Sequence, residues 1–325
     1  MIRIGFSFNR AKGGPANFMN NLKESWEKQG IVKTSMYFNP LNDCNIFANL
    51  PKLTWLNKFF FRIDGIIYDI MADPKLKQIE NNNILRGAKE AQGVIFQSEF
   101  SKKIFETILG FVPYCQTIIH NGTNLDRFRR GDGSIIKNRL GLPMDSFVFI
   151  TSAKWRTHKR LIDIVDSFIR FKERHPKVNT YLLVIGEHKD LKIQNVIFLQ
   201  RINNYELPLY YSAANVYLFY SWLDPCPNSV VEAISCGLPT ICTNQGGTPE
   251  LIKMSNGGIV AEADEPFLYK EVELYNPPHP DMTVIDNAIE EMYANYDYYC
   301  ERIDRSVFDI DLVAKKYYEF INTNL

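Results

Sequence analysis

The sequence predicts an α/β protein made of two doubly wound, Rossmann-like domains. Apolar runs of strand length alternate with amphipathic runs of helix length, and this alternation occurs in two successive series along the chain. Near-continuous apolar strands separated by helices are typical of parallel sheets that are covered on both faces. The chain has 325 residues, 46% of them hydrophobic, which is enough for two cores of ordinary size.

The two series define the expected domains. Strands are expected in the first series at 2–8, 32–38, 58–63, 94–97 and 117–120, with helices at 18–29, 76–91 and 102–109. Strands are expected in the second series at 147–152, 181–186, 196–199, 216–220 and 240–243, with helices at 161–172, 207–213 and 230–236. The glycine-rich and charged stretch 129–143 has little periodicity, which favours a join there. We therefore expect a first domain at 1–130, a second at 131–303 and a final helical segment at 304–325.

Composition excludes several classes of function. Lys+Arg and Asp+Glu both number 37, so net charge gives no sign of a nucleic-acid partner. The 6 cysteines are scattered without a C-x-x-C pair, which indicates a reduced, cytoplasmic protein without a cysteine metal site. The start shows no signal-peptide pattern, and no apolar run approaches the ~20 residues that span a bilayer. Residues 52–62 are aromatic and cationic. A buried strand with charged flanks is the favoured interpretation of them, and contact with a membrane surface is the alternative.

Ligands of open α/β sheets bind beyond the carboxyl ends of the strands, so candidate residues are sought there. Gly13 and Gly14 follow the first strand and precede a helix, a pattern that suits either a bound phosphate or a tight turn. No G-x-G-x-x-G motif occurs, which argues against the hypothesis that the protein is an NAD-linked oxidoreductase. Asp64 and Gly65 end another strand, where the acid either faces a ligand or caps a turn.

A cationic stretch follows the first strand of the second series. Lys154, Arg156, Lys159 and Arg160 surround His158 in this loop. A solvated basic loop is the simple interpretation. The position after a strand favours binding of a pyrophosphate instead.

Two acids bracket a predicted helix start in the second series. Ser229 followed by Glu232 fits a capping box, which would explain Glu232 structurally. Asp224, in the proline-rich loop before it, has no such explanation. Gly246 and Gly247 then precede another helix start and form a second phosphate-type loop.

Together these motifs resemble the retaining glycosyltransferases of family 4, which have the GT-B fold. The family's acid-x7-acid signature corresponds to Asp224 and Glu232, its G-R-L-x3-K-G loop to residues 153–160, and its N-G-V-D-x-x-x-F linker to residues 121–128. The resemblance covers nearly the whole chain. It implies a cleft between the two domains and a final helix that packs on the first domain.

The resemblance also implies roles. Glu232 would bind the ribose of a nucleotide-sugar donor and Asp224 the hydroxyls of the transferred sugar. Lys154 and Lys159 would bind the diphosphate and offset the charge of the departing nucleotide. The remaining donor-binding positions are Gly13, Gly14, Arg156, Asn228, Ser229, Val230, Gly246, Gly247 and Thr248. No metal or other cofactor is expected, because the cations fill that role and no D-x-D follows a strand.

The sequence departs from the family pattern at three positions. Asp224 stands where the family has Glu, Lys154 where it has Arg, and Arg160 where it has Gly. The acceptor-side histidine of many relatives is absent, and Asp64 becomes the candidate there. The expected activity is retaining transfer of a hexose-like sugar from a UDP- or GDP-sugar to a glycan, lipid-linked or other acceptor hydroxyl. A nucleotide-sugar epimerase, a phosphorylase and an inactive nucleotide-sugar-binding subunit remain alternatives.

Overall fold

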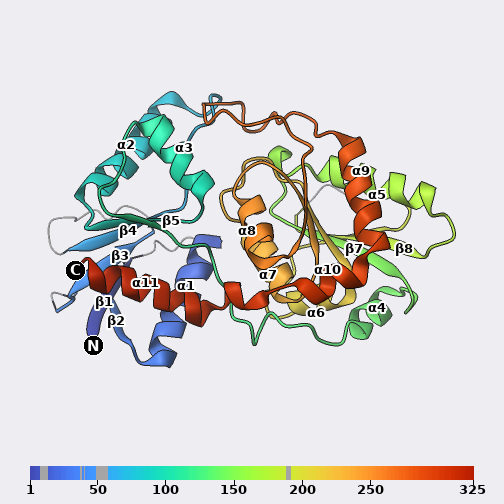
Figure 1. Ribbon diagram of the computed structural model, residues 1–325, viewed down its shortest axis with the longest axis horizontal. Coiled ribbons are helices and arrows are strands. Elements are labelled where there is room, and N and C mark those ends of the chain that lie inside the picture. The colour runs from blue at the N-terminus through green and yellow to red at the C-terminus, as the bar shows by residue number, and fades with distance from the viewer. Residues whose placement is uncertain (8–13, 37–38, 40, 49–57, 188–191) are drawn as a thin grey trace. The chain divides into compact units, whose positions relative to one another are not determined.

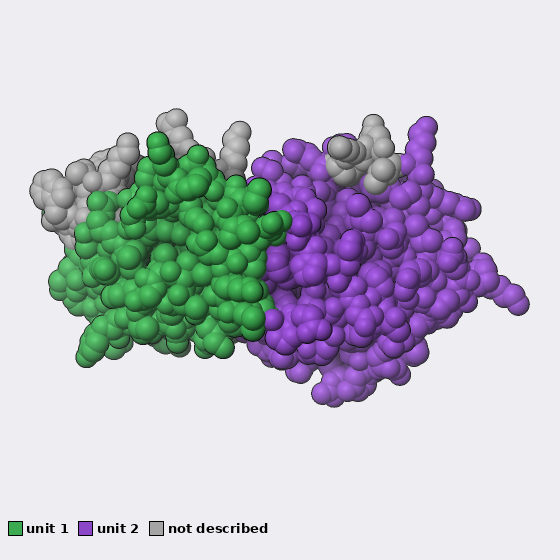
Figure 2. All heavy atoms as spheres, turned by 90° about the horizontal axis from the view of Figure 1, so that it is seen from above, with its two compact units in different colours: residues 1–124, 267–274, 308–325 green, residues 125–266, 275–307 purple. Residues whose placement is uncertain are grey.

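A computed structural model describes residues 1–7, 14–36, 39, 41–48, 58–187 and 192–325 (Figure 1). The chain forms two compact units, coloured separately in Figure 2. Unit 1 consists of Met1–Asn124, Phe267–Leu274 and Phe308–Leu325, and unit 2 of Leu125–Pro266 and Tyr275–Val307. The polypeptide therefore passes from one unit to the other more than once.

Unit 1 is a 6-stranded sheet, order β2-β1-β3-β4-β5-β6, in which every pairing is parallel. Its strands are β1 (Ile2–Ser7), β2 (Val32–Met36), β3 (Cys44–Phe47), β4 (Phe59–Ile63), β5 (Gly93–Phe96) and β6 (Gln116–Ile118). Its helices are α1 (Gly14–Gln29), α2 (Pro74–Glu90), α3 (Glu99–Leu109) and α11 (Ile310–Thr323). Successive side chains of a strand point to opposite faces. Ile95 accordingly packs with the α1 and α11 side chains, while Phe96 contacts Phe105 of α3.

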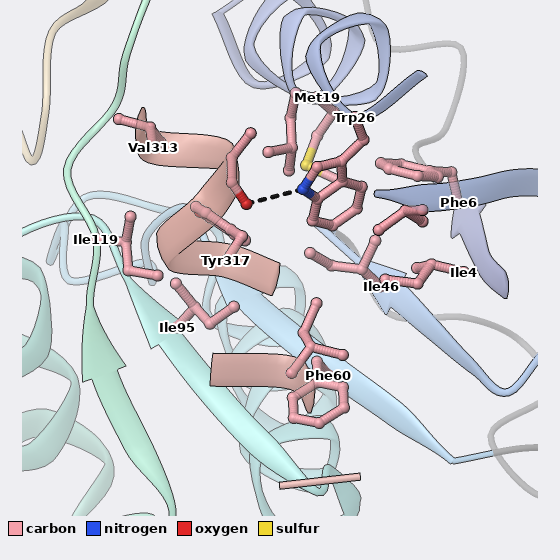
Figure 3. Close-up of a cluster of buried hydrophobic side chains, with 14 of the residues drawn as sticks. Ile4, Phe6, Met19, Trp26, Ile46, Phe60, Ile95, Ile119, Val313 and Tyr317 are labelled. Carbon is pink, nitrogen blue, oxygen red and sulfur yellow. Dashed lines mark hydrogen bonds between the residues drawn. The ribbon is translucent and has the colours of Figure 1, made fainter. Parts of the chain in front are cut away.

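Helix α11 completes the core of unit 1 (Figure 3). Trp26 and Tyr317 are both fully buried, and the Trp26 indole N–H donates to the Ala314 carbonyl at 2.8 Å. A Cβ atom on Gly122 would lie 2.8 Å from the Val313 Cγ2 atom. The glycine of the linker motif is therefore needed where α11 approaches the backbone closely.

Unit 2 is a second all-parallel sheet of 6 strands, order β12-β11-β10-β7-β8-β9. Its strands are β7 (Phe147–Ser152), β8 (Thr180–Ile185), β9 (Val196–Leu199), β10 (Val216–Phe219), β11 (Thr240–Thr243) and β12 (Gly258–Ala261). Its α-helices are α4 (Ser134–Leu140), α5 (Leu161–Arg174), α6 (Leu207–Ala213), α7 (Asn228–Ser235), α8 (Thr248–Ser255), α9 (Met282–Ala294) and α10 (Tyr296–Arg302). Phe149 and Leu218 pack on the α5 and α9 side, whereas Tyr217 contacts Tyr211 of α6. Both sheets thus confirm the predicted doubly wound α/β class.

A short segment between β12 and α9 belongs to unit 1 and is named the crossing segment (Phe267–Leu274). Val272 pairs with the backbone of residues 68–70: its N–H donates to the Tyr68 carbonyl at 3.1 Å, and its carbonyl accepts from Ile70 at 2.9 Å. The rings of Phe267 and Tyr269 each lie 6.0 Å from the Phe100 ring of α3. The crossing segment therefore extends the structure of unit 1 by backbone pairing and aromatic packing.

Strands β3 and β12 and helix α4 were not predicted from the sequence. Strands β3 and β12 have only 4 residues each, too few for a clear periodicity. Helix α4 lies in the stretch expected to be an aperiodic join, and only Ile136 of it is buried. Phe59–Ile63 form a buried strand, as the favoured interpretation of residues 52–62 predicts, while residues 52–57 lie outside the described part. Within the described part, no helix is both long and apolar enough to span a membrane.

Candidate active site

The topology of unit 2 identifies where a ligand is expected. The chain runs outward from β7 through β8 to β9, then returns to β10 beside β7 and runs outward the other way. Ligands of open α/β sheets bind at such a reversal of strand order, at the carboxyl ends of the two central strands. The cationic loop 153–160 leaves β7 there, and the acidic loop 221–227 leaves β10.

Lys159 and Asp224 form an ion pair between these two loops. The Lys159 ammonium contacts the Asp224 Oδ2 atom, and the two side chains are only 16% and 14% exposed. The ammonium also lies 5.4 Å from the centroid of the Phe219 ring. The two residues, assigned from the sequence to the diphosphate and to the sugar, are therefore in direct contact at the strand ends.

The glycine loop after β11 lies against Asp224. The Gly247 N–H donates to the Asp224 carbonyl at 2.8 Å. Gly246 has a φ of +85°, and a Cβ atom there would lie 2.8 Å from the same carbonyl oxygen. Thr248 begins α8, and its buried hydroxyl has no hydrogen-bond partner among the described residues. Gly246 is therefore required for the close approach of the two loops.

The predicted capping box of Ser229 and Glu232 is wrong. Helix α7 begins at Asn228, its N-cap position is occupied by Pro227, and no side chain caps it. The Pro227 carbonyl accepts from the Val230 N–H at 3.1 Å, which is the hydrogen bond of an earlier helix start. The proline ring fixes φ, here −71°, and so lets the helix begin two residues before the position that Ser229 would have set.

Glu232 therefore does not cap the start of α7. Its carboxylate accepts no hydrogen bond from any residue in the described ranges. Burial raises the pKa of Glu232 to about 8, and the nearby positive charge of Arg127 opposes that rise. Glu232 is half-buried, and a carboxylate there without a hydrogen-bond donor favours a ligand that brings hydroxyl donors.

The remaining cationic loop combines exposed charges with a buried histidine. Lys154 and Arg156 are exposed, and Arg156 donates to the Tyr275 hydroxyl at 3.3 Å. His158 is buried, and burial, aided by Lys159, lowers its pKa to about 4. His158 is therefore neutral near pH 7, so the cationic character of the loop comes from its lysines and arginines.

Asp64 lies in unit 1 within a closed ring of polar side chains at the carboxyl ends of β4, β5 and β6. Arg62 pairs with the Asp64 Oδ1 atom and donates to Asn121 at 2.9 Å. Asn121 donates to Gln97 at 3.3 Å, and Gln97 donates back to Asp64 Oδ1 at 2.7 Å. The Asp64 Oδ2 atom has no hydrogen-bond partner among the described residues. Burial raises the pKa of Asp64, and the Arg62 charge opposes this.

Other predicted residues are placed as follows. Gly14 is the first residue of α1, whereas Gly13 lies outside the described residues. Gln97 and Asn121 were not predicted as site residues, although Gln97 ends one predicted strand and Asn121 directly follows another. Across the ranges that the structure describes, no three His, Cys, Asp or Glu side chains gather as a metal site would require.

The similarity in sequence to known proteins lies mainly in unit 2. Residues 133–271 match the family model of group 1 glycosyl transferases. An uncharacterized glycosyltransferase of Methanocaldococcus jannaschii is 27% identical over 198 residues, which are 58% of this chain and 48% of that protein. The alpha-monoglucosyldiacylglycerol synthase of Acholeplasma laidlawii is 25% identical over 205 residues, 58% of this chain and 51% of the synthase. The chain thus spans about half the length of these curated relatives.

Solved structures with a similar fold superimpose on nearly the whole chain. Sucrose-phosphate synthase from Thermosynechococcus elongatus superimposes with a TM-score of 0.72 at 16% identity, covering 99% of both chains. The chain has the GT-B fold, and its residues 133–271 are similar to the group 1 glycosyl transferases. Anabaena HepE, solved in complex with UDP and glucose, superimposes on this chain with a TM-score of 0.68 at 16% identity, covering 99% of this chain and 100% of HepE. At such identities these structures establish the fold alone.

The matched region of the chain contains the ion pair of Lys159 and Asp224, Glu232 and the glycine loop. Asp64 and Gly14 lie outside it. The match to the family model therefore covers the loops of unit 2, while the polar ring in unit 1 is a feature that the structure reveals.

Proposed function

We propose that the protein transfers a hexose-like sugar from a UDP- or GDP-sugar to an acceptor hydroxyl, with retention of configuration. The observation that carries the proposal is the Lys159–Asp224 ion pair, which joins the cationic and acidic loops at the strand-order reversal of unit 2. The Glu232 carboxylate lies on α7, the helix that follows the acidic loop. The structures of HepE with UDP and with UDP-glucose support a nucleotide-sugar donor for a protein of this fold. The acceptor is a glycan or a lipid-linked molecule.

In the proposed mechanism the residues of unit 2 act on the donor. Lys154 and Lys159 offset the charge that develops on the diphosphate as the glycosidic bond breaks. Glu232 accepts hydrogen bonds from the ribose hydroxyls, and Asp224 accepts from hydroxyls of the sugar. A departing phosphate oxygen takes the proton of the acceptor hydroxyl, which attacks the same face of the sugar. Such a reaction requires neither a protein nucleophile nor a divalent cation.

Asp64 is the proposed acceptor-side residue. The ring of Arg62, Asn121 and Gln97 fixes the Oδ1 atom, whereas the Oδ2 atom is buried without a hydrogen-bond partner among the described residues, and we assign it to a hydroxyl of the acceptor. Preorganisation of this kind favours a productive orientation of the acceptor. The variant Asp64→Asn should therefore retain UDP binding and lose transfer.

A screen of nucleoside diphosphates and their sugars by thermal shift tests the donor assignment, because a ligand that binds only the folded state raises the melting temperature. UDP or GDP should raise it, and failure of every nucleoside diphosphate to do so would reject the proposal. The anomeric configuration of the product, read by NMR with EDTA present, tests retention and metal independence. Isomerised donor would indicate an epimerase, sugar phosphate would indicate a phosphorylase, and donor binding without transfer to any acceptor would indicate an inactive binding subunit.

A further inference from the structure

Arg160 occupies the position at which the family loop has a glycine. Its backbone is left-handed, with a φ of 54°, a conformation that glycine adopts freely and most other residues avoid. Its side chain is 1% exposed, so the charge is not presented to solvent or to a diphosphate in the manner of the exposed Lys154. A strained backbone with a buried charge persists only where the surroundings compensate strongly.

The compensation is a bidentate ion pair with Asp264. The Arg160 Nη1 and Nη2 atoms donate to the two Asp264 carboxylate oxygens at 2.9 and 2.7 Å. The Asp264 side chain is also 1% exposed. Nη2 further donates to the Pro278 carbonyl at 2.5 Å, and Nη1 to the Tyr220 carbonyl at 3.4 Å. Only a planar guanidinium can make this set of contacts at once.

These contacts join the loops of unit 2 that carry candidate donor residues. Arg160 ends the cationic loop, Tyr220 lies between β10 and the acidic loop, and Asp264 follows β12. Asp264 is in turn bonded to Asn244 after β11: its N–H donates to the Asn244 side chain at 2.9 Å, and its carbonyl accepts from that side chain at 3.0 Å. The loops after β7, β10, β11 and β12 are therefore tied to one buried ion pair.

The ion pair is connected through the backbone to the residues assigned to the donor. Arg160 immediately follows Lys159, whose ammonium pairs with Asp224. The carbonyl of His158 accepts from the Trp222 N–H at 2.8 Å, which links the cationic and acidic loops a second time. A shift of Arg160 would thus change the separation of the Lys159 and Asp224 backbones.

We propose that Arg160 is a positioning residue for the donor site: its buried pair with Asp264 holds the cationic loop and the acidic loop in the arrangement that binds the diphosphate and sugar. The proposal rests on the proposed function and deepens it. Arg160 itself touches no substrate. It acts through Lys159 and Asp224.

The test compares Arg160→Lys, which keeps the charge but not the planar fork, with Ile289→Ala, which destabilises the core of unit 2 away from these loops. The dissociation constant for UDP and the amide exchange of residues 153–160 and 221–227 are measured well below both melting temperatures. Arg160→Lys should weaken UDP binding at least about tenfold and accelerate exchange in both loops. Ile289→Ala should lower the melting temperature and change neither quantity.

The double variant Arg160→Gly with Asp264→Asn separates positioning from stability. It removes both buried charges and restores the residue suited to a left-handed backbone, so its melting temperature should exceed that of Asp264→Asn alone. UDP binding should remain weak, because the loops are no longer joined. Wild-type UDP affinity and wild-type loop exchange in Arg160→Lys would overturn the inference. Absence of UDP or GDP binding by the wild-type protein would instead overturn the proposed function, while the exchange measurement would still test the positioning of the loops.

Discussion

The Lys159 ammonium is paired with the Asp224 carboxylate, although 65 residues separate them in the chain. Neither side chain is more than 16% exposed, so each depends on the other for charge balance. A bound diphosphate would compete with Asp224 for the ammonium. The pair therefore connects the two halves of the proposed donor chemistry.

Replacing Asp224 should separate binding from turnover. Asp224→Asn removes the carboxylate that competes for Lys159, so UDP affinity should be maintained or increased. Transfer should fall about 10- to 100-fold, the equivalent of a lost hydrogen bond to a charged group. Lys159→Met removes the ammonium that would bind the diphosphate, so it should lower the affinity for UDP markedly. Calorimetric titration with UDP and steady-state kinetics check both variants, and a parallel loss of UDP affinity in Asp224→Asn would place Asp224 away from the sugar.

Glu232 should make nucleotide binding depend on pH. Its pKa of about 8 means that the free protein holds this carboxyl protonated at pH 7, whereas hydrogen bonds from a ribose diol favour the ionised form. Binding should therefore release a proton, and UDP affinity should rise from about pH 6 to pH 8. In Glu232→Gln, affinity should be lower at pH 8 and should lack this component of the pH dependence. Titration of both proteins in two buffers of different ionisation enthalpy measures the proton release.

The raised pKa of Glu232 should also make the stability of the folded protein depend on pH. The folded-state pKa of Glu232, about 8, lies above the ordinary value of 4.5, so the folded protein holds a proton that the unfolded chain releases between these pH values. The contribution of Glu232 to the free energy of unfolding should decline as pH rises through this range. Glu232→Gln should therefore gain in melting temperature relative to wild type as pH rises from 5 to 8. A constant difference across that range would contradict the assignment.

Gly246 should tolerate no side chain. Gly246→Ala would place a Cβ atom 2.8 Å from the Asp224 carbonyl oxygen and 2.9 Å from its backbone nitrogen, at a φ of +85°. We expect a loss of about 1–3 kcal/mol in the free energy of unfolding and a fall in transfer. Gly141→Ala is a matched control, because Gly141 has a φ of +66° with nothing within 4 Å of the added atom. Denaturant unfolding and kinetics on both variants separate crowding at Asp224 from backbone strain alone.

Trp26→Phe should reveal how far unit 1 depends on α11. The variant leaves the buried Ala314 carbonyl without its indole donor, which should cost about 1–3 kcal/mol of unfolding free energy. Lys28→Ala removes an ion pair to Asp311 on the same two helices, but the Lys28 side chain is 67% exposed. That change should cost less than about 1 kcal/mol. Equal effects in urea unfolding would mean that the buried hydrogen bond is not what fastens α11.

The sequence could predict elements that are long and strongly periodic, together with site residues that lie close in the chain. Strand β7 has the predicted bounds, and Glu232 was found from its spacing to Asp224. The ring of Arg62, Gln97 and Asn121 depends instead on which strands are neighbours, and local pattern does not encode sheet order. Helix α7 shows a second limit: Ser229 and Glu232 match a capping box, but Pro227 starts the helix earlier.

Other features lacked a local signal for the same physical reason. The crossing segment is aperiodic, and its pairing with residues 68–70 is a tertiary choice made far from its place in the chain. Arg160 stood out in the sequence only as a departure from a glycine. Its partner Asp264 lies 104 residues away and could not be identified before the ends of β7 and β12 were known to lie at the same edge of one sheet.

The discontinuity of unit 1 has a consequence for biosynthesis. A ribosome delivers the chain from its amino end, yet the first unit lacks Val313, Ala314 and Tyr317 until α11 has been made. Unit 2 ends at Val307, so it can form its hydrophobic core before α11 is available to complete the core of unit 1. We expect the nascent protein to mature in reverse order of its domains, and a fragment ending at Asn124 to expose the apolar surface around Trp26 and aggregate.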